Sequence, residues 1–201
     1  MATSTASPRA ARDPGNPLAI ALILIGLLLA FSWLPRLGFG AGHHPLVSKP
    51  APEFGLEVVH TGTTPPAPYS AVASGTTLRL AELKGRPVLL DFWATWCGPC
   101  RREAPILSKV ADKFRDKGLV VLGINTGDRP GLAAPFAVQM QLSYPILFDA
   151  THDAADHYDV DTLPTVVMVG RDGAVRAVHS GLLSESTLTT WVEEALAAPG
   201  G

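Results

Sequence analysis

The sequence predicts an α/β domain, a central mixed sheet flanked by helices, that is preceded by one N-terminal transmembrane helix. Apolar runs rich in strand formers alternate with helical patterns after residue 53, which is typical of a sheet whose strands are joined by helices. A long uncharged apolar segment precedes that alternation and predicts the membrane helix. Among 201 residues, 47% are apolar and only 17% are charged, which provides ample material for a core and excludes a disordered charged protein.

Charge and cysteine content narrow the possible function classes. Sixteen basic and eighteen acidic side chains leave a net charge of −2, so no overall field favours nucleic acid and we expect no nucleic-acid partner. The chain has only two cysteines, which excludes a disulfide-stapled mini-protein and a four-cysteine zinc site.

The apolar segment at 18–34 reads LAIALILIGLLLAFSWL, and only Gly26 and Ser32 interrupt it. As a helix, it would span roughly 26 Å, close to the ~30 Å hydrocarbon core of a bilayer. We expect a transmembrane anchor or uncleaved signal, because Trp33 and Pro35 are typical of a helix end at the membrane interface. A cleaved secretory signal is the alternative.

The anchor divides the chain into four parts. We expect a cytoplasmic N-terminal tail at 1–17, the anchor at 18–34, a Pro- and Gly-rich linker at 35–52, and a folded domain at 53–198. The linker prediction depends on the absence of a periodic apolar pattern, which favours an extended spacer. This organisation predicts a single-pass protein of the cell inner membrane with its folded domain on the periplasmic side.

The first half of the folded part begins with an expected β-hairpin. Residues 53–80 hold two short pieces of alternating polarity around a Pro-rich turn. Residues 87–93, PVLLDFW, form a continuous run of strand formers, which is typical of a buried central strand. Residues 101–117 carry apolar side chains at helical spacing and are followed by Gly118, which predicts a helix that ends there. Residues 119–124, LVVLGI, predict a second buried strand.

The second half contains shorter elements. We expect, in order, a helix at 132–142, a strand at 145–148, a short helix at 153–158, strands at 165–169 and 174–179, and a final helix at 184–197. Residues 171–173, Arg-Asp-Gly, form a turn sequence that joins the last two strands as a hairpin. Ser184 stands at the start of the final helix, where it is a candidate N-cap.

Both cysteines lie in one motif, Trp96-Cys97-Gly98-Pro99-Cys100, between the central strand and the long helix. A thiol at a helix N-terminus faces unpaired N–H groups and the positive end of the helix dipole, which stabilise its thiolate. The spacing lets the second sulfur reach the first and resolve a mixed disulfide. A half zinc site would need two further ligands, and no histidine shows ligand spacing, so redox chemistry is favoured and no metal or cofactor is expected.

Several motifs resemble those of the thioredoxin superfamily. The resemblance lies in DFWATWCGPC at 91–100, in Ala-Pro at 104–105 and in Leu-Pro-Thr at 163–165. More narrowly, the chain is similar to the TlpA/ResA-like membrane-anchored thiol–disulfide oxidoreductases. That similarity is carried by the anchor, by APEF at 51–54, by LAELKGRP at 80–87 and by an additional segment at 132–160. It implies a thioredoxin-like fold with an N-terminal β-hairpin and a central αβ insertion.

The resemblance also implies roles for individual residues. Cys97 corresponds to the attacking thiol and Cys100 to the resolving thiol, and the two would form a disulfide when oxidised. Pro164 corresponds to a cis-proline beside the active site, and Pro105 to a proline that bends the long helix without ending it. The residues expected to contact a substrate are Trp96, Gly98, Pro99, Leu163 and Thr165.

Two carboxyl groups join the candidate catalytic residues. Asp91 interrupts an apolar strand and corresponds to the buried aspartate of cytoplasmic thioredoxins, but residues 119–124 lack the lysine that accompanies it there. We therefore expect a carboxyl group that keeps its proton more easily near neutral pH. Glu103 lies one helical turn after Cys100 and corresponds to a glutamate of the TlpA/ResA-like proteins. A solvated residue in the first helical turn is the alternative for Glu103.

The resemblance implies an extracytoplasmic enzyme that reduces protein disulfides, with cytochrome c maturation among its processes. Its implied partners are protein disulfide substrates, among them apocytochrome c, and a membrane electron donor that reduces the enzyme again. A copper metallochaperone that binds through the two thiolates, or an oxidant that introduces disulfides, are the alternatives. A peroxidase is less favoured because no cysteine lies outside the motif.

Overall fold

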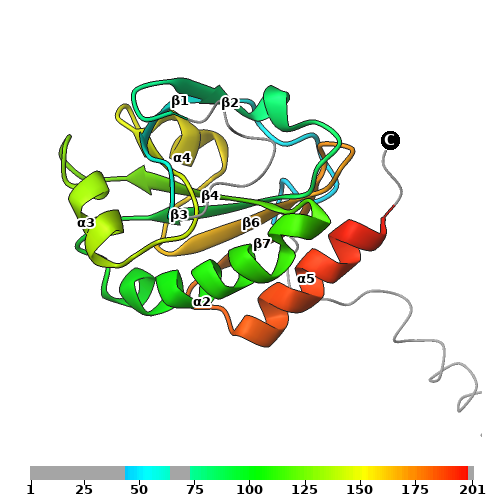
Figure 1. The fold of residues 1–201 in the computed structure, drawn as a ribbon. Helices are drawn as coiled ribbons and strands as arrows, with labels where there is room; N and C mark the ends of the chain where they lie inside the picture. Colours follow the sequence, from blue (N-terminus) through cyan, green and yellow to red (C-terminus); the bar gives the residue numbers. More distant parts are fainter. Residues whose placement is uncertain (1–43, 64–72, 199–201) are drawn as a thin grey trace, which may run out of the picture. The chain divides into compact units, whose positions relative to one another are not determined.

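The computed structural model describes residues 44–63 and 73–198, which form a seven-stranded mixed sheet with helices on both faces (Figure 1). The strand order across the sheet is β2-β1-β5-β4-β3-β6-β7. Strands β3, β4 and β5 pair in parallel, and the other neighbours pair antiparallel. The strands are β1 (Gly55–His60), β2 (Thr77–Arg79), β3 (Val88–Trp93), β4 (Val120–Thr126), β5 (Ile146–Asp149), β6 (Thr165–Val169) and β7 (Val175–Ser180).

The helices divide between the two faces of the sheet. They are α2 (Gly98–Phe114), α3 (Ala133–Gln139), α4 (Asp153–His157) and α5 (Glu185–Ala197), with 3₁₀ turns η2 (Leu80–Leu83) and η3 (Arg115–Lys117). Helices α2, α3 and α5 contribute to one apolar cluster, and α4 and η2 contribute to a second cluster. Figure 1 shows α2 and α5 side by side on one face, with α4 on the other.

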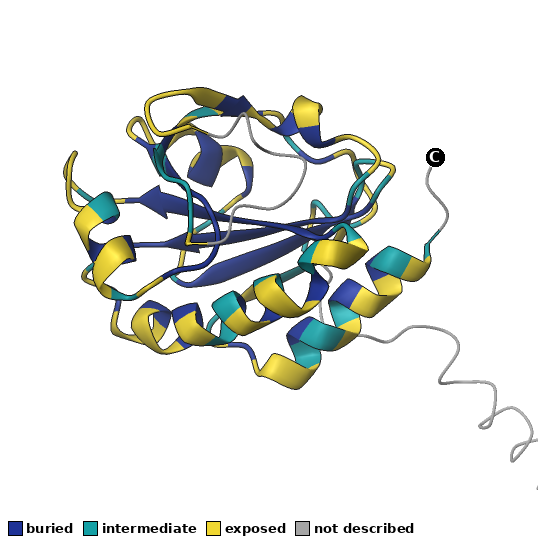
Figure 2. Cartoon of the chain, viewed as in Figure 1, coloured by how far each residue is buried: buried dark blue, intermediate teal, exposed yellow. Residues whose placement is uncertain are grey.

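Strand β3 supplies side chains to both clusters because successive strand residues point to opposite faces. Leu89 and Trp93 belong to the cluster under α2, whereas Leu90 and Phe92 belong to the cluster under α4. All six residues of β3 are buried, and the sheet forms the buried centre in Figure 2. The same alternation places Asp91 on the α2 face, among apolar side chains.

The long helix follows the predicted pattern. α2 continues through Pro105 to Phe114, as expected, and the 3₁₀ turn after it ends at Gly118. Gly118 has φ 98°, a left-handed conformation that favours glycine. At the other end of the fold, Ser184 caps α5 by accepting a hydrogen bond from the backbone N–H of Thr187 at 3.1 Å.

Two predicted boundaries are wrong. The linker was expected to reach residue 52, but Ser48 and Lys49 bond through their backbones to Val175 at 2.8 and 2.9 Å, and Ala51 is buried. This segment adds to the edge of β7 by backbone hydrogen bonds, which require no apolar periodicity. The helix expected at 132–142 ends earlier, because Gln141 takes φ 52° and leaves the helical conformation.

Part of the predicted organisation lies outside the described residues: the tail, the anchor at 18–34, the first half of the linker at 35–43 and the Pro-rich turn at 64–68. Within the described ranges, none of the helices has the length and apolar character needed to cross a membrane.

Candidate active site

The two cysteines lie where the chain leaves β3 and enters α2. Cys97 is the N-cap of α2, and its sulfur accepts a hydrogen bond from the Cys100 N–H at 3.2 Å. The two residues form a disulfide, with Cα atoms 5.3 Å apart. Because Cys97 lies at the N-terminus of a 17-residue helix, the helix dipole and the free N–H groups favour its thiolate once the disulfide is reduced.

The surface around the disulfide is formed by neighbouring residues. Cys97 and Cys100 are only 4% and 3% exposed, whereas Trp96 is 66% exposed. Gly98 and Pro99 are exposed as well. Trp96, Gly98 and Pro99 are therefore the exposed residues next to the two buried sulfurs, and their contact with a substrate stays a prediction.

The peptide bond between Leu163 and Pro164 is cis, as the sequence predicts. The register of β6 against β3 pairs Thr165 with Phe92, so Pro164 lies beside the end of β3, where the chain turns towards Cys97. Leu163 packs against the apolar cluster that contains both cysteines.

Thr165 differs from the other residues expected to contact a substrate. Its side chain is buried, and its hydroxyl is bonded to the Thr162 carbonyl oxygen at 2.7 Å and the Ser180 hydroxyl at 2.9 Å. The Thr165 side chain is therefore not available for the substrate contact that the resemblance implies.

Asp91 is buried behind the disulfide, on the face of β3 that α2 covers. Its neighbours across the sheet are Gly123 on β4 and Val166 on β6, so no lysine accompanies it. Its Oδ2 accepts a hydrogen bond from the Tyr144 hydroxyl at 3.5 Å, while Oδ1 has no hydrogen-bond partner in the described part of the chain. Burial raises the pKa of Asp91 well above its usual value, and the nearby Glu103 raises it further, against the opposing effect of Tyr144. This upward shift agrees with the expectation that Asp91 keeps its proton more easily than an ordinary aspartate.

Glu103 is also fully buried, so the alternative of a solvated helix residue is wrong. Its Oε1 accepts a hydrogen bond from the backbone N–H of Leu183 at 2.8 Å, while Oε2 has no such partner within residues 44–63 and 73–198. Burial raises the pKa of Glu103 from 4.5 to about 7, although the Leu183 hydrogen bond opposes this shift. A carboxyl group with a pKa near 7 can both accept and donate a proton at neutral pH.

Tyr144 is a site residue that the sequence analysis missed. It reaches Asp91 because β4 carries no side chain at Gly123, where an added Cβ would lie 3.1 Å from the Tyr144 ring and 2.6 Å from Ile146. The sequence signal for this contact is the glycine inside the apolar run 119–124, because a glycine in a strand often marks a place where another group packs closely against the backbone. The structure thus brings together three buried titratable side chains, Asp91, Glu103 and Tyr144, and Tyr144 belongs to the apolar cluster that also contains the cysteines.

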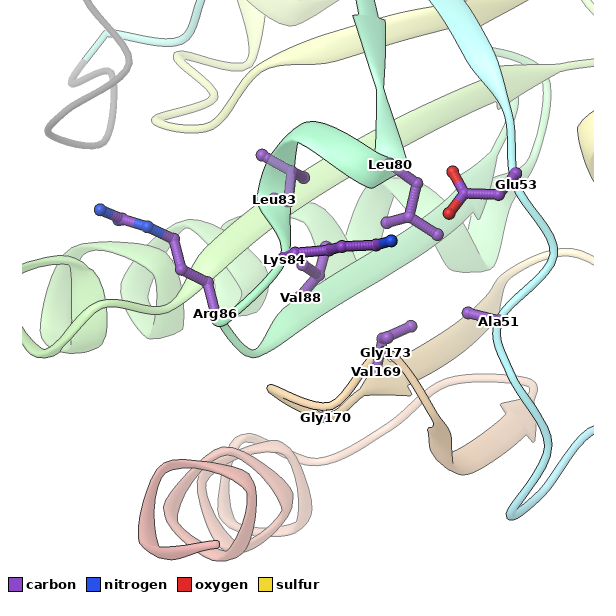
Figure 3. Close-up of a pocket in the computed structure, with 10 residues that line it drawn as sticks. All are labelled: Ala51, Glu53, Leu80, Leu83, Lys84, Arg86, Val88, Val169, Gly170 and Gly173. Atoms are coloured by element: carbon purple, nitrogen blue, oxygen red, sulfur yellow. The ribbon is translucent and has the colours of Figure 1, made fainter. Parts of the chain in front are cut away.

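The pocket shown in Figure 3 lies elsewhere in the fold. Its lining includes Val88, the first residue of β3, and Val169, the last residue of β6, so it sits at the opposite end of β3 from Cys97. Its volume of about 30 Å³ is far below that of a typical small-molecule site. In the part of the chain that the structure describes, no group of three or more His, Cys, Asp or Glu side chains is arranged to hold a metal ion. The geometry supports the chemistry of the dithiol because Cys97 and Cys100 form a disulfide at the N-terminus of α2.

Comparison with known proteins points to the same chemistry. A model of the AhpC/TSA family matches residues 47–178. The thiol-disulfide oxidoreductase ResA of Bacillus subtilis is 30% identical over 146 residues, which span 73% of this chain and 80% of that protein.

Two solved structures are also similar. A thiol:disulfide interchange protein DsbE from Chlorobium tepidum is 28% identical with a TM-score of 0.64, over 75% of this chain and 98% of that one. A secreted Mycobacterium tuberculosis disulfide oxidoreductase is 26% identical with a TM-score of 0.58, over 70% of this chain and 95% of that one.

Proposed function

Because this chain belongs to the AhpC/TSA family and resembles the ResA-type thiol–disulfide oxidoreductases within it, we propose that it reduces protein disulfides outside the cytoplasm. It is a thiol–disulfide oxidoreductase, as its relatives and its close Cys97–Cys100 pair indicate. Beyond that activity, we propose the direction of electron flow, the compartment and the substrates. The observation that carries the proposal is the disulfide at the N-cap of α2, beside the exposed side chain of Trp96.

Reduction of a substrate proceeds in two exchange steps. The Cys97 thiolate attacks one sulfur of the substrate disulfide, forms a mixed disulfide and displaces the other substrate sulfur as a thiolate. Cys100 then loses its proton, attacks the sulfur of Cys97 and displaces the second substrate thiolate. The substrate has gained two electrons, and the protein ends with its Cys97–Cys100 disulfide. A membrane dithiol donor must reduce that disulfide before the next cycle.

The direction of flow is supported by the residues between the cysteines. Gly98-Pro99 resembles the corresponding pair of reducing thioredoxins. A reduction potential of the Cys97–Cys100 couple close to that of thioredoxin, about −270 mV, would support a reductant. A potential close to that of DsbA, about −120 mV, would instead support an oxidant that introduces disulfides.

The compartment is supported by the apolar segment 18–34 and by the secreted relative. A reporter fused after Gly201 should be active only outside the cytoplasm, and the protein should stay with membranes through a carbonate wash. Cytoplasmic reporter activity would contradict this topology, whereas release into the soluble fraction would favour a cleaved signal. Outside the cytoplasm, apocytochrome c with its cysteine pair is among the expected substrates.

Trapping of substrates tests the assigned roles of the two thiols. Cys100→Ser should accumulate mixed disulfides through Cys97, because the second exchange step is blocked. Cys97→Ser should trap none, and it serves as the matched control. Equal trapping by both variants would contradict the assignment. Tight copper(I) binding by the reduced wild type, without trapping by either variant, would support the metallochaperone alternative.

A further inference from the structure

The short turn at 94–96, which joins β3 to Cys97, is held by side chains from outside it. Asp128, in the loop after β4, accepts two hydrogen bonds from Thr95. Its Oδ2 accepts the Thr95 backbone N–H at 2.7 Å, and its Oδ1 accepts the Thr95 hydroxyl at 2.8 Å. Both distances are short, as expected where a carboxylate is the acceptor. Asp128 therefore binds Thr95, two residues before the attacking thiol, through both of its oxygens.

Asp128 is itself fixed to the sheet. Its Oδ2 also accepts the side-chain N–H of Asn125 at 2.7 Å, and Asn125 is fully buried in β4. The backbone of β4 pairs with β3 on one side and β5 on the other. Asp128 thus links the turn that precedes Cys97 to a central strand of the sheet by hydrogen bonds.

Two further contacts complete the restraint on this turn. The carbonyl oxygen of Thr95 accepts hydrogen bonds from Nε and one terminal nitrogen of Arg101, at 3.0 and 2.9 Å. The indole N–H of Trp96 donates to the carbonyl oxygen of Gly127 at 3.1 Å. The backbone N–H, the hydroxyl and the carbonyl of Thr95 are therefore all bonded, and two of these three groups are bonded to Asp128.

We propose that Asp128 is a positioning residue that holds the turn so that the sulfur of Cys97 is aligned for attack on a substrate disulfide. This inference rests on the proposed role of Cys97 as the attacking thiol. Thiolate attack requires the three sulfur atoms to lie close to a line, and a misplacement of about 1 Å can cost about 100-fold in rate. The second step differs, because Cys100 attacks Cys97 within the first turn of α2. Loss of Asp128 should therefore slow the formation of the mixed disulfide more than its resolution.

Two substitutions at Asp128 separate position from charge. Asp128→Ala removes all three hydrogen bonds and leaves the buried Asn125 amide with only its longer bond, 3.5 Å, to the Trp93 carbonyl oxygen. Asp128→Asn removes the charge but keeps the shape: its oxygen can accept from Thr95 and Asn125, while its NH₂ group donates to the Thr95 hydroxyl oxygen. Asp116→Ala removes an exposed carboxylate beyond the far end of α2 and is the control.

Stopped-flow measurement on the reduced full-length protein, with a disulfide-bonded peptide as substrate, resolves the two steps. For Asp128→Ala, we expect formation of the mixed disulfide to slow about 10- to 100-fold and resolution to change by less than about 3-fold. Asp128→Asn should recover most of the lost rate, and Asp116→Ala should match the wild type. The pH dependence of Cys97 alkylation should be the same in the wild type and in Asp128→Asn.

Other outcomes would overturn the proposal. Equal slowing in Asp128→Ala and Asp128→Asn, with a changed alkylation profile, would assign the effect to charge. If Asp128→Ala formed the mixed disulfide at the wild-type rate, Asp128 would have no role in the attack by Cys97. If Asp128→Ala fails to fold, Thr95→Val is the replacement, because it removes only the hydrogen bond from the Thr95 hydroxyl to Asp128. For the proposal to stand, Thr95→Val must slow formation of the mixed disulfide more than its resolution. Absence of exchange by the wild type would contradict the proposed function instead.

Discussion

At the scale of single residues, we expect two buried carboxyl groups, Asp91 and Glu103, to govern the proton chemistry of the dithiol. Each has one oxygen without a hydrogen-bond partner among the described residues, and each has a raised pKa. The charge of Glu103 raises the pKa of Asp91, so ionisation of Asp91 is disfavoured while Glu103 is ionised. Such a pair can accept the proton that Cys100 must lose before it attacks Cys97.

Replacement of each carboxyl group tests this role. Asp91→Asn should slow resolution of a pre-formed mixed disulfide about 10-fold or more, while its formation changes less, because a proton acceptor is lost. Glu103→Gln should show a smaller effect of the same kind, and it keeps an oxygen for the Leu183 N–H. Stopped-flow measurement of both steps is the test.

The outcomes distinguish the two groups. Slowing confined to Glu103→Gln would transfer the role from Asp91 to Glu103. Unchanged resolution in both variants would leave water as the proton acceptor. Asp91→Asn should in addition raise the free energy of unfolding at neutral pH, because it removes a poorly solvated charge.

Tyr144 gives a second residue-scale prediction. Its hydroxyl favours the ionised form of Asp91, so Tyr144→Phe should raise the pKa of Asp91 further. At 3.5 Å the hydrogen bond is long, so we expect the pH profile of the resolution step to move upward by less than about one pH unit. Rates measured between pH 5 and 9 would show the shift. A profile identical to that of the wild type would remove Tyr144 from the proton chemistry.

At the scale of elements, the site depends on how neighbouring elements are joined. Glu103 of α2 binds the backbone N–H of Leu183, two residues before α5 begins, and so links the catalytic helix to the last helix. Strand β4 has a glycine, Gly123, next to Asp91. Because glycine has no side chain, the Tyr144 ring and Ile146 occupy the space there.

Gly123→Ala tests the importance of that space. The new Cβ would lie 2.6 Å from Ile146 and 3.0 Å from the Trp93 indole nitrogen, so these side chains would have to shift. Overpacking of this kind costs about 1–3 kcal/mol of folding free energy. Urea denaturation of the oxidised protein measures this loss. Gly98→Ala is the matched control for the added methyl group, because nothing lies within 4 Å of a Cβ at Gly98. Equal stability of both variants would show that β4 accepts a side chain beside Asp91.

At the scale of the whole molecule, the buried carboxyl groups link folding to pH. A carboxyl group with a raised pKa in the folded state is protonated in both states at low pH, so its stabilising contribution is fully present there. As pH rises above its unfolded pKa, the unfolded chain loses the proton more easily, and that contribution is lost. For Glu103 the loss extends from about pH 4.5 to about pH 7.

Stability should therefore fall with rising pH across this window, by up to about 3 kcal/mol for the contribution of Glu103. Glu103→Gln should remove that part of the pH dependence, because glutamine does not titrate. Urea denaturation of the oxidised wild type and variant at pH 4, 5.5, 7 and 8 gives the comparison. The same slope in both proteins would show that Glu103 ionises in the folded state as readily as in the unfolded state.

The sequence by itself determined the features that depend on near neighbours in the chain. Apolar runs and helical spacing predicted the hairpin, the strands around 87–93 and 119–124 and the final helix, because burial of a strand or a helix face leaves a local periodic pattern. Ser184 predicted the start of α5, because an N-cap acts within its own first turn. The spacing of Cys97 and Cys100 predicted the disulfide, because two residues between cysteines let the sulfurs meet.

Only the tertiary structure decided which distant groups meet at the dithiol. The hydrogen bond from Leu183 to Glu103 spans 80 positions, that from Tyr144 to Asp91 spans 53, and that from Thr95 to Asp128 spans 33. No local pattern encodes such pairs, because they depend on strand order and on where each loop returns to the sheet. The same holds for residues 48–51, whose backbone bonds to the edge of β7 leave no trace in hydrophobic periodicity. The two cysteines and both carboxyl groups could thus be named from the sequence, whereas the distant residues that bond to Glu103, Asp91 and Thr95 were decided by the fold.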